Sequence, residues 1–411
     1  MSRKILHIGT STQGGAGAAM LRIHLSLLEL GVESKVLVRD TPTQQREVYV
    51  APTASHRGFW YATKLGRFIR RFLHRINCYI SNRDYILFQY AKFRHIQQCC
   101  ITLPVSEYDL STNPLVEWAD IIHLHWVEDF LDYPTFFTKV NKPIVWTFHD
   151  MNAFMGCFHH IRLKDKYATL LGKLERRCYD AKKQALSNCS NLTLVALSDE
   201  MHTYIENHEL YRGRPVFDIP NSVDTDMFTI GDTQETRSLF GVQENAFVFL
   251  FANGNLNDTE KGLQELVNAF QYIQHLPANS CLLCVGNGVI PPCIIPVIHI
   301  HKVNDPAIMA RLYQAANVLV MPSHQEAFPL TPIEAMSCGT PVVITPVSGA
   351  ADMMTQDTGV IAEDYSPDAI GQAIEIALKR TYNSVNIRWH VLENYTLQHI
   401  GTLYRNLYNQ L

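Results

Sequence analysis

The sequence predicts two α/β domains, each built around a parallel β-sheet. Short apolar runs alternate with segments of helix length, which is the pattern of successive strand–helix units. The alternation stops at a turn-rich segment, residues 218–224, and then restarts. A chain of 411 residues is also longer than one ordinary hydrophobic core supports. We therefore expect two domains joined near residue 225.

The predicted strands are apolar runs of three to six residues, as in parallel sheets that are covered on both faces. In the first half they are residues 4–8, 34–38, 121–125, 144–148 and 192–197, with a helix over 18–30. In the second half they are residues 247–251, 281–285, 297–300, 318–321 and 342–344, with helices after 367 and over 397–411. The predicted domains are residues 1–225 and 226–395, followed by a C-terminal helix within 396–411.

Composition excludes some classes of protein. The net charge of −4 gives no general affinity for nucleic acid, so we expect no nucleic-acid partner. The ten Cys have no paired spacing and favour a reducing compartment over a disulfide framework. No apolar stretch approaches the 18 residues of a membrane span, and the N-terminus is typical of a first strand rather than a leader. These observations predict a cytoplasmic protein.

A glycine-rich segment, Gly14-Gly15-Ala16-Gly17, follows the first predicted strand and opens the first helix. Because Gly15 and Gly17 have no side chains, a ligand can reach the backbone amides around them, and such amides at a helix start bind phosphate groups. The dinucleotide fingerprint is incomplete, because Met20 stands where a third Gly or Ala is expected. Asp40, at the end of the second strand, keeps nicotinamide dinucleotide binding open as an alternative.

The segment EAFPLTPIE places Glu326 and Glu334 eight positions apart, in a loop that leads from a strand into a helix. Thr331 before Pro332, with Glu334 three positions after Thr331, predicts a capped helix start. The amides of that helix start would form an anion site beside Glu326. The alternative is structural: Glu334 closes a capping box, and Glu326 is a solvated carboxylate.

Two further residues follow predicted strands, where ligands of parallel sheets bind. Lys261 follows the strand 247–251 and could offset the charge of a phosphate, although it could also be a solvated lysine at a helix start. His149 ends the strand 144–148 and could donate to a substrate hydroxyl, although backbone groups could equally satisfy it.

Glu-x7-Glu followed by Ala-Met-x-Cys-Gly-Thr-Pro-Val-Val resembles the nucleotide-sugar site of family 4 retaining glycosyltransferases. The resemblance implies the GT-B fold: two Rossmann-like, doubly wound domains facing a cleft, with the last helix returning to the first domain. It implies that Glu326 contacts the donor sugar and that Glu334 binds the ribose hydroxyls. His149 would orient the sugar, and Lys261 would stabilise the departing diphosphate. The remaining donor-binding positions are Gly15, Gly17, Asn255, Phe328, Leu330 and Thr331.

One position departs from the family. Asn255 stands where relatives usually carry Arg, so that Lys261 is the cation that remains of the usual pair. The segment Asp-Met-x-x-Phe after His149 resembles the branch that builds bacterial surface polysaccharides. The resemblance thus implies a retaining transferase that moves a hexose from a nucleotide-diphosphate sugar to a glycan or lipid-linked acceptor. Alternatives are a nucleotide-sugar epimerase on the same fold and a nucleotide-binding scaffold with weakened catalysis.

We expect no metal ion and no cofactor besides the nucleotide-sugar substrate. The candidate zinc ligands Cys157, His159, His160 and Cys178 lack the paired spacing of structural zinc sites, although zinc near Cys157 stays an alternative. By the resemblance, Lys and backbone amides rather than a metal ion would stabilise the leaving diphosphate.

An insertion near residues 56–100 of the first domain begins with a basic amphipathic helix. Six Lys or Arg and no acid lie between Arg57 and Arg75, and large apolar residues recur at helical spacing: Tyr61, Leu65, Phe68, Ile69, Phe72 and Ile76. The pattern over 57–76 predicts a helix on an anionic membrane surface, so that the protein would be peripheral at the inner face of the cell membrane. The alternative is that the apolar stripe packs on the first domain.

Overall fold

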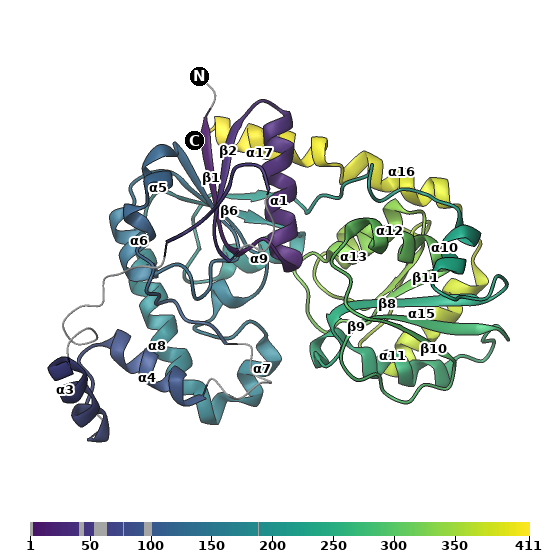
Figure 1. Ribbon diagram of the computed structural model, residues 1–411, viewed down its shortest axis with the longest axis horizontal. Helices are drawn as coiled ribbons and strands as arrows, with labels where there is room; N and C mark the ends of the chain where they lie inside the picture. The colour runs from purple at the N-terminus through teal and green to yellow at the C-terminus, as the bar shows by residue number, and fades with distance from the viewer. Residues whose placement is uncertain (1–2, 41–44, 53–63, 77, 94–100, 188) are drawn as a thin grey trace. The chain divides into compact units, whose positions relative to one another are not determined.

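The computed structural model describes the chain except residues 1–2, 41–44, 53–63, 77, 94–100 and 188 (Figure 1). It divides into two compact units. The N-terminal unit consists of Met1–Ala196, His202–Phe217 and Arg405–Leu411, and the C-terminal unit consists of Leu197–Met201 and Asp218–Tyr404. Each unit is an α/β domain around one sheet (Figure 1).

The N-terminal sheet has seven strands in the order β3-β2-β1-β4-β5-β6-β7. Their bounds are β1 Lys4–Ser11, β2 Glu33–Asp40, β3 Val48–Val50, β4 Ile121–Leu124, β5 Ile144–Thr147, β6 Leu192–Ala196 and β7 Val216–Asp218. The pairings of β1 with β2 and β4, and of β5 with β4 and β6, are parallel. Strands β4, β5 and β6 are buried along their whole length, as expected where helices cover both faces of a parallel sheet.

The helices of the N-terminal part of the chain are α1 Gly14–Glu29, α3 Lys64–Arg75, α4 Asn82–Phe93, α5 Pro114–Trp118, α6 Tyr133–Lys139, α7 Ile161–Lys166, α8 Ala168–Ser187 and α9 Asp199–Asn207, with 3-10 turns at Leu110–Thr112 and Asn152–Phe154. Helices α4, α7 and α8 share an apolar cluster that includes Ile86, Leu163, Leu171 and Cys178. This cluster anchors the insertion.

The C-terminal sheet has six strands in the order β10-β9-β8-β11-β12-β13, and its neighbouring strands are parallel. Their bounds are β8 Phe247–Asn255, β9 Ser280–Asn287, β10 Val297–Ile300, β11 Val318–Met321, β12 Val342–Ile344 and β13 Gly359–Ile361. The prediction of two parallel-sheet α/β domains is therefore confirmed.

The helices of the C-terminal part are α10 Thr233–Leu239, α11 Leu263–Ala269, α12 Pro306–Ala315, α13 Leu330–Ser337, α14 Ala350–Met353, α15 Pro367–Lys379, α16 Ser384–Asn394 and α17 Leu397–Asn409, with 3-10 turns at Thr259–Lys261 and Phe270–Tyr272. Helices α11 and α15 pack against the sheet around Phe249, Phe270 and Ile374. Helix α17 begins in the C-terminal unit, and its last residues, from Arg405, belong to the N-terminal unit.

Short edge strands and some helices, α16 among them, were not anticipated from the sequence. β3, β7 and β13 are three residues long and lie at the edges of their sheets, where a few extended residues suffice for pairing. Helix α16 has no apolar periodicity of its own, because its packing depends mainly on Ile387 and Val391. Helix α1 also begins at Gly14, so the predicted glycine loop is in fact the first turn of that helix.

Among the described helices, none combines the length and the apolar character needed to cross a bilayer. The first part of the predicted basic helix lies outside the described residues, and α3 forms its second part.

Candidate active site

Each sheet has one point where the strand order reverses, and ligands of open parallel sheets bind beyond the carboxyl ends of the strands at such points. In the N-terminal sheet this point lies between β1 and β4, since the chain runs outward to β2 on one side and to β5 on the other. In the C-terminal sheet it lies between β8 and β11. The predicted site residues lie in the segments that leave β1, β8 and β11, except His149, which follows β5.

Lys261 and Glu326 meet at the C-terminal switch point, which is the point between β8 and β11 where the strand order reverses. Lys261 ends the 3-10 turn after β8, and Glu326 lies in the loop between β11 and α13. The Lys261 Nζ lies 2.7 Å from Glu326 Oε1, and both side chains are largely shielded from solvent. Burial opposes the ammonium charge, but the Glu326 carboxylate outweighs that effect and raises the pKa of Lys261. The predicted cation and the predicted sugar-binding acid therefore form one charged pair.

Gly262 explains why the two loops come together. Its φ is +72°, and a Cβ at this position would lie 2.0 Å from the Pro322 carbonyl oxygen. Only a glycine can take up this conformation and allow so close an approach. A hydrogen bond from His324 N to Glu260 O, 2.8 Å, joins the same two segments. The backbone thus fixes where the side chains of Lys261 and Glu326 start.

The predicted cap of α13 is wrong. The helix begins at Leu330 behind Pro329, and no side chain caps it. Pro329 has the extended backbone of an N-cap residue, with φ −69° and ψ 141°, so Thr331 falls inside the first turn. The Thr331 hydroxyl donates instead to the Met321 sulfur at 3.6 Å. Because no side chain occupies the first-turn amides, they retain the capacity to bind an anion.

Glu334 and Phe328 are held by groups of their own unit. Glu334 is buried, and its Oε2 accepts a hydrogen bond from the Tyr313 hydroxyl of α12 at 2.9 Å. Phe328 is buried too, and its carbonyl accepts from Asn221 Nδ2 at 2.8 Å. Leu330 is half-buried at the helix start. Glu334 is therefore oriented before any ligand arrives, although the capping box proposed for it does not exist.

Asn255 ends β8, and its side chain accepts from the backbone N of Asn257 at 3.1 Å, which shapes the turn. A lysine that the sequence reasoning missed lies close to this turn. The Cδ and Cε of Lys302 pass 3.8 and 3.5 Å from the point where a Cβ on Gly254 would stand, so the lysine side chain runs alongside the backbone of β8. Lys302 is exposed and its backbone N donates to Asn287 Oδ1, at the end of β9. It supplies a second cation near the ends of β8 and β9.

The two glycines predicted to bind the donor differ in their surroundings. Gly17 is buried, and a Cβ there would lie 2.5 Å from the carbonyl carbon of Thr12, so it lets α1 start directly against the end of β1. Gly15 is exposed and a Cβ would meet nothing within 4 Å. The helix start has no side-chain cap, since Gln13 makes none. Its free amides are consistent with an anion site, and Gly15 is the glycine open to a ligand.

His149 follows β5 and is half-buried. Its Nε2 lies 3.1 Å from His125 Nδ1, just beyond the end of β4. Burial lowers the pKa of His149 to about 4, although the neighbouring Asp150 carboxylate opposes that shift. The imidazole is therefore neutral at physiological pH.

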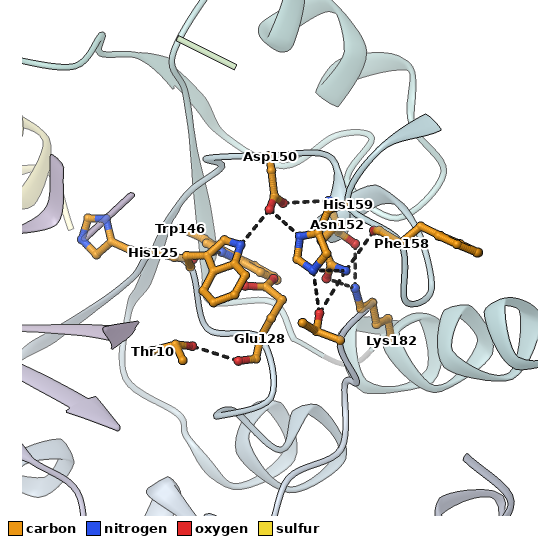
Figure 2. A network of polar contacts seen from close by, with 11 residues as sticks. Thr10, His125, Glu128, Trp146, Asp150, Asn152, Phe158, His159 and Lys182 are labelled. Carbon is orange, nitrogen blue, oxygen red and sulfur yellow. Dashed lines mark hydrogen bonds and ion pairs between the residues drawn. The ribbon is translucent and has the colours of Figure 1, made fainter. Parts of the chain in front are cut away.

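Asp150 organises the loop after His149 (Figure 2). Its Oδ2 accepts from Trp126 Nε1 at 2.7 Å and lies 2.6 Å from His159 Nδ1. Burial alone would raise the pKa of Asp150, but the charge and the hydrogen bond of His159 lower it to about 2. The same ion pair raises the pKa of His159 against the effect of burial. This network gives the His149 loop a fixed geometry.

Lys182 and Glu128 extend the buried charges of this region (Figure 2). The Lys182 Nζ donates to both the carbonyl and the side-chain oxygen of Asn152 at 2.6 Å. Glu128 is buried, and one of its carboxylate oxygens, Oε2, has no hydrogen-bond partner. Burial, and then the charge of Asp150, raise the pKa of Glu128 to about 7.

The ligand atoms of three buried histidines, His7, His123 and His125, converge to within 4.8 Å of one another. Among the described residues this is the group of three or more that could hold a metal ion, and the zinc alternative near Cys157 finds no such group. Cys157 and Cys178 lie in the apolar cluster that includes α8, where the hydrogen bond between the two thiols, and then burial, raise the pKa of Cys157. The raised pKa of Cys157 disfavours the thiolate that zinc requires.

Part of the chain is similar to a known protein family. Residues 247–380 match the model of the family "Glycosyl transferases group 1". This match covers most of the C-terminal unit and contains β8, Lys261, Glu326 and Glu334.

Curated relatives carry related names. The chain is 32% identical over 196 residues to a D-inositol 3-phosphate glycosyltransferase of Segniliparus rotundus, covering 43% of each sequence. It is 30% identical over 211 residues to a protein of the same name in Geodermatophilus obscurus, covering 46% of this chain and 45% of that one. The match thus spans less than half the length of these relatives.

Solved structures match along the whole chain. The Anabaena protein HepE in complex with UDP and glucose superposes with a TM-score of 0.65 at 16% identity, covering all of both chains. Sucrose-phosphate synthase from Thermosynechococcus elongatus gives 0.63 at 18% identity, covering 99% of each. At such low identity the likeness shows the fold, which is that of two-domain GT-B proteins.

Proposed function

We propose that the chain is a retaining hexosyltransferase that uses a nucleotide-diphosphate sugar and a glycan or lipid-linked acceptor in polysaccharide biosynthesis. The observation that supports this best is the Lys261–Glu326 pair, which stands at the switch point of a group 1 glycosyltransferase domain with its Nζ and Oε1 2.7 Å apart. A pair of this kind offers a cation for a phosphate and a carboxylate for sugar hydroxyls.

Donor binding would rearrange this pair. The diphosphate would lie on the first-turn amides of α13 and would draw the ammonium of Lys261 toward its oxygens, with Lys302 as the second cation in place of the family's usual Arg. Glu326, released from Lys261, would accept hydrogen bonds from the hexose, and Glu334 would hold the ribose. His149 would donate to a substrate hydroxyl. The departing diphosphate oxygen would take the proton of the acceptor hydroxyl.

The curated relatives favour a second candidate acceptor. Because those relatives are named D-inositol 3-phosphate glycosyltransferases, an inositol phosphate belongs in any acceptor panel beside glycans and lipid-linked sugars. The surface-polysaccharide acceptor is supported by the segment Asp150-Met151 with Phe154, whose Asp150 shapes the His149 loop.

The first experiment is a thermal-shift screen of the native chain against UDP-, GDP-, ADP- and dTDP-hexoses. A donor at about 100 times its dissociation constant adds about 2.7 kcal/mol to stability, so one base should raise the melting temperature clearly. The best donor is then incubated with each acceptor class, and a glycosylated product of retained anomeric configuration is expected. If no nucleotide sugar moves the melting curve, the proposal fails.

The same reactions separate the alternatives. An epimerase would convert the donor to a new sugar nucleotide without any acceptor, which NMR of the donor alone would show. A scaffold would bind the donor but form no product with any acceptor. Either result would replace the transferase by that alternative.

We also propose that the protein docks peripherally on the cytoplasmic face of an anionic membrane through α3. The apolar stripe of this helix faces solvent: the exposed fractions are 60% for Leu65, 70% for Phe68 and 57% for Phe72. The opposite face holds the helix, since His74 Nε2 lies 2.8 Å from the buried Asp84 of α4. This exposure argues against the alternative in which the stripe packs on the domain.

Cations flank the exposed stripe. Lys64, Arg71 and Arg75 are exposed beside it, and each cation close to an anionic surface contributes about 1 kcal/mol. The test is sedimentation of the full chain with vesicles of phosphatidylcholine, with and without phosphatidylglycerol. We expect binding that requires phosphatidylglycerol and is lost in Phe68→Ser/Phe72→Ser. Trp389→Ser, which alters an equally exposed side chain on α16, should bind normally. Equal loss in both variants, or binding without anionic lipid, would contradict the proposal.

A further inference from the structure

Three histidines form a continuous hydrogen-bonded chain from the His149 loop into the core of the N-terminal unit. His149 Nε2 lies 3.1 Å from His125 Nδ1, and His125 Nε2 lies 3.0 Å from His7 Nδ1. The rings of adjacent members are stacked, with centroids 5.4 and 5.3 Å apart. His7 and His125 are buried, and His7 Nε2 has no hydrogen-bond partner.

All three imidazoles are neutral, because burial lowers the pKa of each of them. A neutral imidazole carries one N–H and one bare nitrogen, so each contact in the chain needs a proton from one side only. Since His125 uses both nitrogens, its tautomer fixes the tautomers of its two neighbours. Only two arrangements of protons satisfy both contacts.

In the first arrangement His7 Nδ1–H donates to His125, and His125 Nδ1–H donates to His149 Nε2. The proton of His149 is then on Nδ1, and the unpartnered Nε2 of His7 is bare. In the second arrangement every proton shifts to Nε2. The buried His7 would then hold an N–H without an acceptor, and buried orphan N–H groups are rare in proteins.

We propose that His7 and His125 are positioning residues that hold His149 in the Nδ1–H tautomer, so that it presents a hydrogen-bond donor to the substrate. Among the described residues no hydrogen bond of His149 Nδ1 is found, so this donor is available. A histidine in this state gives a hydrogen bond to an oxygen and cannot take a proton at the same nitrogen. His149 therefore donates a hydrogen bond to a sugar hydroxyl rather than acting as a general base. That the substrate is a sugar rests on the proposed function.

The same histidines could instead hold a metal ion, but their hydrogen bonds oppose it. His125 uses both ring nitrogens within the chain, and His123 contacts the hydroxyls of Tyr408 at 2.7 Å and Thr147 at 2.8 Å. A metal ion would have to break at least one contact of each of these two rings. No carboxylate is part of the group, so its charge would be poorly compensated.

The test reads the tautomer directly and does not depend on activity. The full chain is labelled with ¹⁵N-histidine, the His149 signals are assigned by their loss in His149→Asn, and two-bond ¹H–¹⁵N correlations identify the protonated nitrogen. We expect a protonated Nδ1 and a bare Nε2 at neutral pH. A protonated Nε2, or a mixture of tautomers, would overturn the proposal, whereas failure of the transferase assay would leave this result unchanged.

Two matched variants test the role of the chain. In His125→Phe the link to His149 is lost, and the His149 tautomer should shift toward a mixture. His123→Phe is the control, because the His123 ring centroid lies 4.0 Å from that of His125 without belonging to the chain, so His149 should keep its tautomer. Melting temperatures establish that both variants fold. An unchanged His149 tautomer in His125→Phe would contradict the proposal. So would a shift of the His7, His123 and His125 signals that is complete when one equivalent of Zn²⁺ has been added.

Discussion

Gly262→Ala is the substitution that tests most sharply how the Lys261–Glu326 pair is built. The native residue has φ +72°, which costs an alanine about 1–2 kcal/mol. The new methyl group would also stand 2.0 Å from the Pro322 carbonyl oxygen, and forcing such contacts apart costs about 1–3 kcal/mol more. The expected loss of stability is therefore about 2–5 kcal/mol.

This loss converts into a measurable change in melting temperature. For a unit of this size, each kcal/mol corresponds to about 2–4 °C, which predicts a decrease of about 4–20 °C for the C-terminal transition. Because the contact joins the loops that carry Lys261 and Glu326, activity should also fall. A displacement of about 1 Å at such a site costs about 10²-fold in turnover.

Gly241→Ala is the matched control. Gly241 has φ +68°, but a Cβ there would meet nothing within 4 Å. It should therefore lose about 1–2 kcal/mol from backbone strain alone and keep its activity. The assay is calorimetry of the native chain and both variants, followed by donor turnover. If the two variants melt at the same temperature and both stay active, the reasoning about the loop contact is refuted.

Three further predictions concern neighbouring groups. Lys302→Met should raise the KM for the donor several-fold if Lys302 is the second cation, and a KM equal to the native value would remove it from the site. Tyr313→Phe removes the hydroxyl that donates to Glu334 Oε2 and should cost about 1–3 kcal/mol of stability together with affinity for the nucleotide sugar, measured by denaturant unfolding and nucleotide binding. A variant as stable as the native chain would show that this bond contributes little. Folding raises the pKa of Glu128 from 4.5 to about 7, so the folded chain binds this proton more tightly than the unfolded chain. The free energy of unfolding of the native chain should therefore fall relative to that of Glu128→Gln as the pH rises from about 4.5 to 7. Above pH 7 the difference should stay constant. Parallel pH curves for the two proteins would contradict this.

The long strands could be predicted from the sequence because their apolar runs are dictated by burial on both faces. The position of Lys261 and Glu326 after β8 and β11 followed from the same pattern, since chain order alone places both residues after strands. Their contact did not follow, because it depends on Gly262 and on which strands become neighbours at the switch point. The glycine directly after Lys261 was the available signal.

Other features depended on tertiary contacts that no local pattern records. The prediction of Thr331 as the N-cap of α13 was wrong because Pro329 takes the N-cap conformation. A Thr before a Pro is only a statistical indication of a helix start. The histidine chain joins residues in or directly after three different strands, so it could not be predicted from the alternation of apolar residues. The one indication in the sequence was that His123 and His125 flank a single leucine. Lys302 approaches Gly254 from a loop after a different strand, which sequence spacing could not show.

The most direct measurement of the central claim is donor-dependent release of nucleoside diphosphate in the presence of acceptor, compared between the native chain, Lys261→Met and Lys173→Met. Lys173 is an exposed lysine on α8 and serves as the control for loss of one charge. Loss of the ammonium that stabilises the leaving diphosphate should lower turnover by about 10²–10³-fold in Lys261→Met. Lys173→Met should turn over at the native rate. Native turnover in Lys261→Met would contradict the account.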